Sequence, residues 1–302
     1  VFKPEEVGPM EIQTQNGVVD IEVEDDAEAV AVAKKYLSYF QGPLSSWEAG
    51  DPIKLRTVIP ESRKRAYNVR NVIKALADTD SFLELRPKFG PCMVTGLLRI
   101  EGRPFGVIAN NPMHMAGAIE AEGADKAAKL MMLCNAHGLP ILSLCDTPGF
   151  MVGPDIEKRA QVRHVCRMFV VGSHVTVPYF TVVLRRGYGL GVMAMARGGF
   201  HESFFTAAWP TGEFGGMGLE GAVKAGFKKE LTAIEDPVKR EELYEFLVSQ
   251  LYERGKAINM AAHLEIDAVI DPADTRKWIM QGLKSVPERK PDQAGHTFVD
   301  PW

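Results

Sequence analysis

The sequence predicts an α/β protein built around a mostly parallel sheet. Two observations lead to this prediction. Short apolar runs alternate with segments of helical periodicity along most of the 302 residues. Three of these runs end in loops rich in Gly, Pro and Asn, and functional groups of parallel sheets collect at such strand ends. Strands that alternate with helices pair in parallel, and the helices pack outside the sheet.

Composition and charge exclude several classes of protein. The chain is 46% hydrophobic and 25% charged with a formal net charge of −4, which is typical of a soluble globular protein. It has no basic excess for nucleic acid and no apolar run of about 18 residues for a membrane. The first residues, VFKPEEVGPM, lack the pattern of a signal peptide. We therefore expect a cytoplasmic protein with neither nucleic-acid nor membrane partners.

The cysteines fit the same compartment. None has a CxxC or zinc-site spacing, and each lies in an apolar stretch, so we expect buried free thiols in a reducing environment. The four cysteines are Cys92, Cys134, Cys145 and Cys166.

Periodicity and turn residues predict the elements in order. Apolar side chains at helical spacing predict a helix over 25–40, and a connector rich in Gly and Pro follows over 41–60. The next predicted helices cover 68–77, 124–137, 156–173, 219–227, 237–262 and 273–282, with a further helix beginning near 189. The predicted strands cover 82–85, 94–100, 104–110, 140–145, 177–184, 203–208 and 266–270.

The turn after the strand at 177–184 is the most informative loop. Gly187, Gly189 and Gly191 lead from an apolar strand into a helix, whose first N–H groups and dipole favour a negative charge. One interpretation is an oxyanion hole made by the backbone N–H groups of Leu190 and Gly191. The other is that the glycines only permit a tight turn. The residues alone leave both open.

Two more loops follow strands. Asp146-Thr147-Pro148-Gly149-Phe150 is a turn in which Asp146 is either an acid or base or, as capping would explain, structural. Residues 209–218 form either a rigid loop or a wall or second set of donors near the same pocket. No HxxxH or HxxE pair, nucleophile elbow or P-loop is present, so we expect no metal site, serine hydrolase or nucleoside triphosphatase.

Taken together, these loops resemble the carboxyltransferase (β-type) subunits of biotin-dependent acyl-CoA carboxylases, in the C-terminal half of those subunits. The resemblance runs from about 58 to 284. It rests on Ala66-Tyr67-Asn68-Val69-Arg70, the Ala-Asn-x-Pro loop at 109–112, Lys126-Ala127-Ala128, Cys134-Asn135-Ala136, Asp146-Thr147-Pro148-Gly149-Phe150, Tyr188-Gly189, Ala208-Trp209-Pro210-Thr211 and Met217-Gly218.

The resemblance implies a crotonase fold of repeated ββα units. It divides the chain into a junction segment (1–57), a carboxyltransferase C-terminal domain (58–284) and a tail (285–302). It implies an enzyme that moves CO2 from carboxybiotin to the α-carbon of an acyl-CoA. The N–H groups of Leu190 and Gly191 would stabilise the biotin enolate, which is itself the base. The implied substrate-binding residues are Gly189, Val192, Met193, Asp146, Pro148, Gly149, Phe150 and Asn110.

The same resemblance implies several partners. Biotin would arrive on a biotin carboxyl carrier domain that a biotin carboxylase charges, and the carboxyltransferase N-terminal half would come from another chain or a longer precursor. Assembly into an oligomer is expected. Many family members carry Gly-Gly-Ala-Tyr-Asp where this chain has Gly189-Leu190-Gly191-Val192-Met193. The Met at the acyl-selecting Asp position leaves the acyl group open. An alanine is expected to fit at Gly191 if the φ there is negative.

Three alternatives stay open at this stage. A decarboxylase or transcarboxylase of the same fold would run the same chemistry with other partners. A crotonase-type hydratase or isomerase would need a pair of carboxylates near the glycine turn, and none is evident in the sequence. A non-catalytic assembly scaffold would not need the glycine turn.

Overall fold

The computed structural model describes residues 2–3, 6–63, 65–287 and 299–300. Within them, one sheet of eight strands runs in the order β1-β2-β3-β4-β5-β6-β8, and β7 pairs with β5. β1, β2 and β3 pair antiparallel, and every pairing from β3 onward is parallel. The strands are β1 (Leu83–Leu85), β2 (Met93–Ile100), β3 (Arg103–Asn110), β4 (Ile141–Thr147), β5 (Tyr179–Tyr188), β6 (Phe205–Ala208), β7 (Glu213–Gly215) and β8 (Ala268–Val269).

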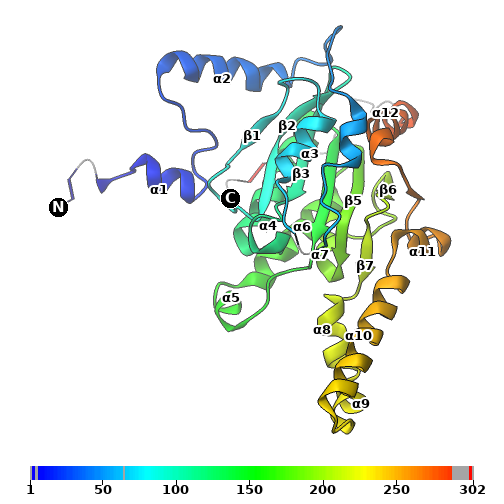
Figure 1. The fold of residues 1–302 in the computed structure, drawn as a ribbon. Coiled ribbons are helices and arrows are strands. Elements are labelled where there is room, and N and C mark those ends of the chain that lie inside the picture. The colour runs from blue at the N-terminus through cyan, green and yellow to red at the C-terminus, as the bar shows by residue number, and fades with distance from the viewer. Residues whose placement is uncertain (1, 4–5, 64, 288–298, 301–302) are drawn as a thin grey trace.

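Helices cover both faces of this sheet (Figure 1). Successive residues of a strand point to opposite faces, so the buried residues divide into two clusters. One cluster packs the sheet against α4, α6 and α7, and the other packs it against α3 and α12. The helices are α1 (Met10–Gln15), α2 (Asp26–Ser38), α3 (Val69–Leu76), α4 (Ala121–His137), α5 (Pro154–Lys158), α6 (Gln161–His174), α7 (Gly189–Met195), α8 (Leu219–Gly226), α9 (Lys228–Ala233), α10 (Pro237–Arg254), α11 (Ala257–Ala262) and α12 (Thr275–Ser285).

The predicted alternation of strands and helices is confirmed, but two predicted helices are wrong in extent. The helix expected over 156–173 is split into α5 and α6 at Ala160, whose φ is 56°. The helix expected over 237–262 ends at Arg254. Gly255 follows it, and there a Cβ would lie 2.3 Å from the carbonyl oxygen of Phe214. The short elements α1, α9 and β7 were not predicted, because none is long enough to show a periodicity.

Cysteine burial is confirmed for three positions and wrong for one. Cys92, Cys134 and Cys145 are buried, whereas Cys166 lies on the exposed side of α6, and all four are free. The predicted tail over 285–302 falls mostly outside the described residues. Among the helices that are described, none is both long and apolar enough to cross a membrane.

Candidate active site

The glycine turn joins β5 directly to α7. β5 ends at Tyr188 and α7 begins at Gly189, whose φ is +59°. A Cβ on Gly189 would lie 2.9 Å from the carbonyl oxygen of Gly216, so both conformation and space require glycine. No side chain caps α7, and the first N–H groups of a helix have no partner within it. Because Leu190 is exposed, this positive helix end opens to solvent.

Gly191 is a glycine for a different reason. It is buried, and a Cβ there would lie 2.7 Å from the Cα of Gly149. Gly149 itself has a φ of +120°, and Thr147 accepts its N–H through Oγ1 at 3.1 Å. The two loops that the sequence singled out therefore meet backbone to backbone. The expectation that alanine fits at position 191 is wrong, because the added methyl group would overlap the Gly149 backbone.

Asp146 is a structural anchor of this region. Its side chain has no exposed surface. One carboxylate oxygen accepts from Nε of Arg185 at 3.0 Å, and the other accepts from Nε of Arg186 at 2.8 Å. The backbone N–H of Asp146 donates to Oδ1 of Asn110 at 3.1 Å, and Asn110 is also fully buried. A carboxylate held by two cations holds the strand ends together, so its acid–base interpretation is not supported.

A cleft of about 770 Å³ lies beside the turn, at the carboxyl ends of the strands. Pro112 and Pro148 border it from the loops after β3 and β4, and Tyr188 borders it at the end of β5. Its opposite wall is α10, which contributes Tyr244 and Tyr252. Of the strand-end residues predicted from sequence, Pro148 thus lines the cleft, and Gly189 and Leu190 lie next to Tyr188.

Other predicted substrate-binding residues lie elsewhere. The side chain of Val192 is buried in the core, and Met193 packs against the same cluster. Phe150 packs edge-on against Phe169 with ring centroids 6.2 Å apart. The side chains of Asn110, Asp146 and Val192 are buried, and contact of these residues with a substrate stays a prediction. For Gly189, Met193, Pro148, Gly149 and Phe150, substrate contact stays a prediction.

Sequence reasoning missed an ionic group in this cleft. Glu213, at the start of β7, is buried and lies 2.8 Å from Nε of Arg63. The guanidinium of Arg63 in turn lies 4.0 Å from the ring centroid of Tyr252. Burial raises the pKa of the Glu213 carboxyl above its ordinary value, and the Arg63 cation opposes that shift. These residues are far apart in the chain, so no local pattern identifies them as neighbours.

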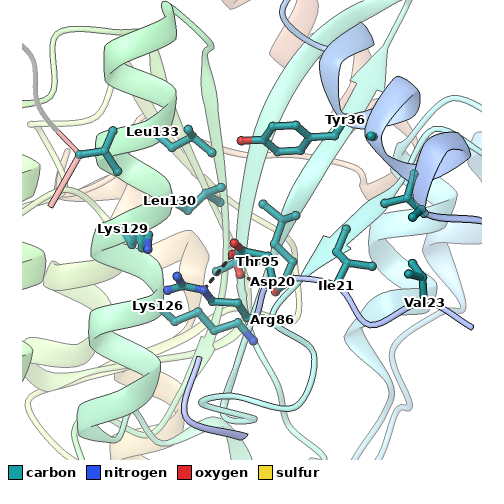
Figure 2. A pocket seen from close by; sticks show the side chains of 15 residues that line it. Asp20, Ile21, Val23, Tyr36, Arg86, Thr95, Lys126, Lys129, Leu130 and Leu133 are labelled. Carbon is teal, nitrogen blue, oxygen red and sulfur yellow. Dashed lines mark hydrogen bonds and ion pairs between the residues drawn. The ribbon is translucent and has the colours of Figure 1, made fainter. Parts of the chain in front are cut away.

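A second cavity, of about 420 Å³, lies between α2, β1 and α4 (Figure 2). Its lining is mostly apolar. Arg86 pairs with Asp20 at 2.8 Å, and Nζ of Lys126 donates to the carbonyl oxygens of Phe89 and Met93 at 2.9 and 2.8 Å. Because these charged groups already serve the fold, we place the chemistry at the cleft beside the glycine turn.

Fold and site together agree with one family. The carboxyl transferase domain family matches residues 3–294, so the chain belongs to it. It is 34% identical over 285 residues to the methylmalonyl-CoA carboxyltransferase 12S subunit of Propionibacterium freudenreichii subsp. shermanii, covering 89% of this chain and 52% of that subunit.

Two solved structures support the same assignment. A single-chain, multidomain long-chain acyl-CoA carboxylase is 53% identical with a TM-score of 0.86, covering 93% of this chain and 28% of that one. The transcarboxylase 12S hexamer assembly, with methylmalonyl-CoA bound, is 31% identical with a TM-score of 0.85, covering 98% of this chain and 59% of that one. The crotonase-type fold of these carboxyltransferases is therefore confirmed.

The chain spans about half the length of the curated relatives that it matches, 54% and 52% for two of them. The match to a carboxyl transferase family gives the hydratase or isomerase alternative no support.

Proposed function

We propose that this chain is the biotin-facing part of a carboxyltransferase, which moves CO2 from carboxybiotin to the α-carbon of an acyl-CoA. The observation that carries the proposal is the uncapped start of α7. It presents N–H groups at the exposed Leu190, beside a cleft and at the carboxyl ends of parallel strands. Such donors stabilise a negatively charged oxygen without a side-chain base.

Biotin fits this arrangement chemically. Carboxybiotin, when delivered by a carrier domain, would supply the CO2. The N–H groups of Leu190 and Gly191 would hold its ureido oxygen and stabilise negative charge there, and the Gly149 loop keeps the turn from shifting. Asp146 binds Arg185 and Arg186 and so holds the ends of β4 and β5 together. The chain's own residues thereby orient the bound group and stabilise its negative charge.

The acyl group is part of the proposal. The 53% identical neighbour is a long-chain acyl-CoA carboxylase, so we assign this chain a long-chain acyl-CoA. Leu190, exposed at the mouth of the turn, adds an apolar side chain where many family members carry Gly, and Met193 stands in place of the family's acyl-selecting Asp. A biotin carboxyl carrier domain, a biotin carboxylase and the carboxyltransferase N-terminal half complete the proposed assembly. Transfer in the transcarboxylase direction is the second candidate, because the 12S subunit matches at 34% identity.

A pair of substitutions at Leu190 tests the backbone donor. Leu190→Pro removes the N–H, and the first turn of a helix tolerates proline. Leu190→Ala removes the same side chain and keeps the N–H. We expect the proline variant to transfer carboxyl groups roughly 100- to 1000-fold more slowly than the alanine variant. The rates are measured in the assembled carboxylase, with thermal unfolding alongside. Equal rates in two folded variants would refute the oxyanion assignment.

A further inference from the structure

Tyr188 connects the glycine turn to the wall of the cleft. It is the last residue of β5 and the N-cap of α7, so its backbone sets the direction in which the turn begins. Its side chain is 3% exposed, and its hydroxyl donates to Oε2 of Glu213 at 3.2 Å. β7 runs parallel to the end of β5, with Gly215 opposite Tyr188, so this bond fixes the two strands near the turn.

Glu213 is held from the other side as well. Its Oε1 lies 2.8 Å from Nε of Arg63, and the Arg63 guanidinium stacks 4.0 Å from the centroid of the Tyr252 ring on α10. Nη1 of Arg185 donates to the backbone oxygens of residues 63 and 65 at 3.2 and 2.9 Å, which fixes the segment carrying Arg63. Both carboxylate oxygens are therefore occupied, and Glu213 is not a free base.

We infer that Glu213 and Tyr188 are positioning residues for the oxyanion turn. The carboxylate anchors the phenol hydroxyl, and the phenol anchors the backbone from which the N–H donors of Leu190 and Gly191 start. The inference rests on the proposed carboxyl transfer. Oxyanion donors act only within a narrow range of distances, and a misplacement of about 1 Å costs roughly 100-fold in rate. A network that holds the strand end therefore affects turnover without touching the substrate.

Tyr188→Phe removes one oxygen atom from the network, and Glu213→Gln keeps the shape while removing the charge. We expect each variant to lower kcat for carboxyl transfer roughly 10- to 100-fold while KM for acyl-CoA changes less than about twofold. The assays use the assembled enzyme. A kcat within about twofold of the unsubstituted enzyme for both variants would overturn the inference, and so would a loss confined to KM.

The double variant separates a shared role from two independent ones. If both residues act through one hydrogen bond, Tyr188→Phe combined with Glu213→Gln loses no more activity than the worse single variant. Losses that multiply would overturn the inference, because they would mean that each side chain acts by itself.

Tyr39→Phe is the matched control. Tyr39 is equally buried, and its hydroxyl donates to the carbonyl oxygen of Ser81, away from the cleft. This variant should lose thermal stability comparably and keep its kcat. A similar loss of kcat in Tyr39→Phe would overturn the inference, because destabilisation alone would then explain the data. The proposed function has its own test in the two Leu190 variants. If Tyr188→Phe keeps its kcat while Leu190→Pro transfers carboxyl groups slowly, only the inference about positioning is refuted.

Discussion

At the scale of single residues, the glycines show what a sequence can predict. The conformational role of Gly189 follows from its place between a strand and a helix, and its φ of +59° agrees with that. The role of Gly191 does not follow from local sequence, because its constraint is the backbone of Gly149 in another loop. Likewise, the sequence predicts either a capping or an acid–base role for Asp146, but its two arginine partners on β5 are visible only in the folded chain.

The contact between Gly191 and Gly149 predicts the effect of Gly191→Ala. The added Cβ would lie 2.7 Å from the Gly149 Cα and 3.3 Å from Cγ2 of Thr147, so the turn must shift. Overpacking of this kind costs about 1–3 kcal/mol. We expect a lower free energy of unfolding together with slower carboxyl transfer, measured by chemical denaturation and by the assembled assay.

Gly226→Ala is the control for that substitution. No atom lies within 4 Å of a Cβ built on Gly226, which ends α8 with ordinary φ. Alanine there should leave stability and transfer unchanged or raise stability slightly, since alanine favours helix. A Gly191→Ala variant as stable and active as this control would contradict the close contact between the two loops.

At the scale of elements, sequence patterns located most of the sheet and several helices but not their ends. The predicted alternation after residue 93 was confirmed, because strands that are buried on both faces form continuous apolar runs. The ends of α5 and α10 were missed for different reasons. The chain after α10 needs glycine at position 255 because the carbonyl oxygen of Phe214 lies against it, and this contact is not visible in the sequence. After α5, Ala160 adopts a positive φ although no glycine marks the position. β7, only three residues long, has no pattern of its own.

Helix α4 contains a buried cation with a measurable consequence. Lys126 is 2% exposed, and its ammonium group donates to two carbonyl oxygens of the segment before β2. Burial lowers the pKa of Lys126 from its ordinary value of 10.5 to about 8. Between these two pH values the unfolded chain still binds the proton that the folded chain has released. Stability therefore rises with pH across this window.

We expect the free energy of unfolding to rise by about 3 kcal/mol, relative to a Lys126→Met variant, between pH 8 and pH 10.5. In the difference between the unfolding free energies of the two proteins, the contributions of all other titrating groups cancel. Denaturation curves at several pH values measure it. Parallel stability profiles for the two proteins would mean that Lys126 titrates normally and that its burial carries no electrostatic cost.

At the scale of the whole molecule, two helical segments stand away from the sheet. Figure 1 shows α2 and the group α8–α10 projecting from the body on different sides. Neither α2 nor α10 has a buried residue. Both expose large apolar side chains, among them Val30 and Leu37 on α2 and Val238 and Phe246 on α10. Exposed apolar side chains on helices without a buried residue favour a contact with another protein. Such a contact fits the proposed assembly with an N-terminal half and further subunits.

This surface leads to a prediction about assembly. We expect the complete carboxyltransferase to be an oligomer in which α10 packs against another subunit or domain. Phe246→Glu places a charge on the exposed apolar face and should shift the light-scattering mass downward and slow carboxyl transfer. The thermal stability of each subunit should hardly change, because Phe246 is 59% exposed within the chain. Lys239→Glu is the control. Lys239 is also exposed on α10, and its replacement changes the charge of the helix at a position that is already polar, so the light-scattering mass should stay unchanged. If both variants keep the mass and activity of the unsubstituted protein, α10 is not the interface.

A protein that is monomeric and fully active before any substitution would show that the cleft beside α7 needs no neighbouring subunit.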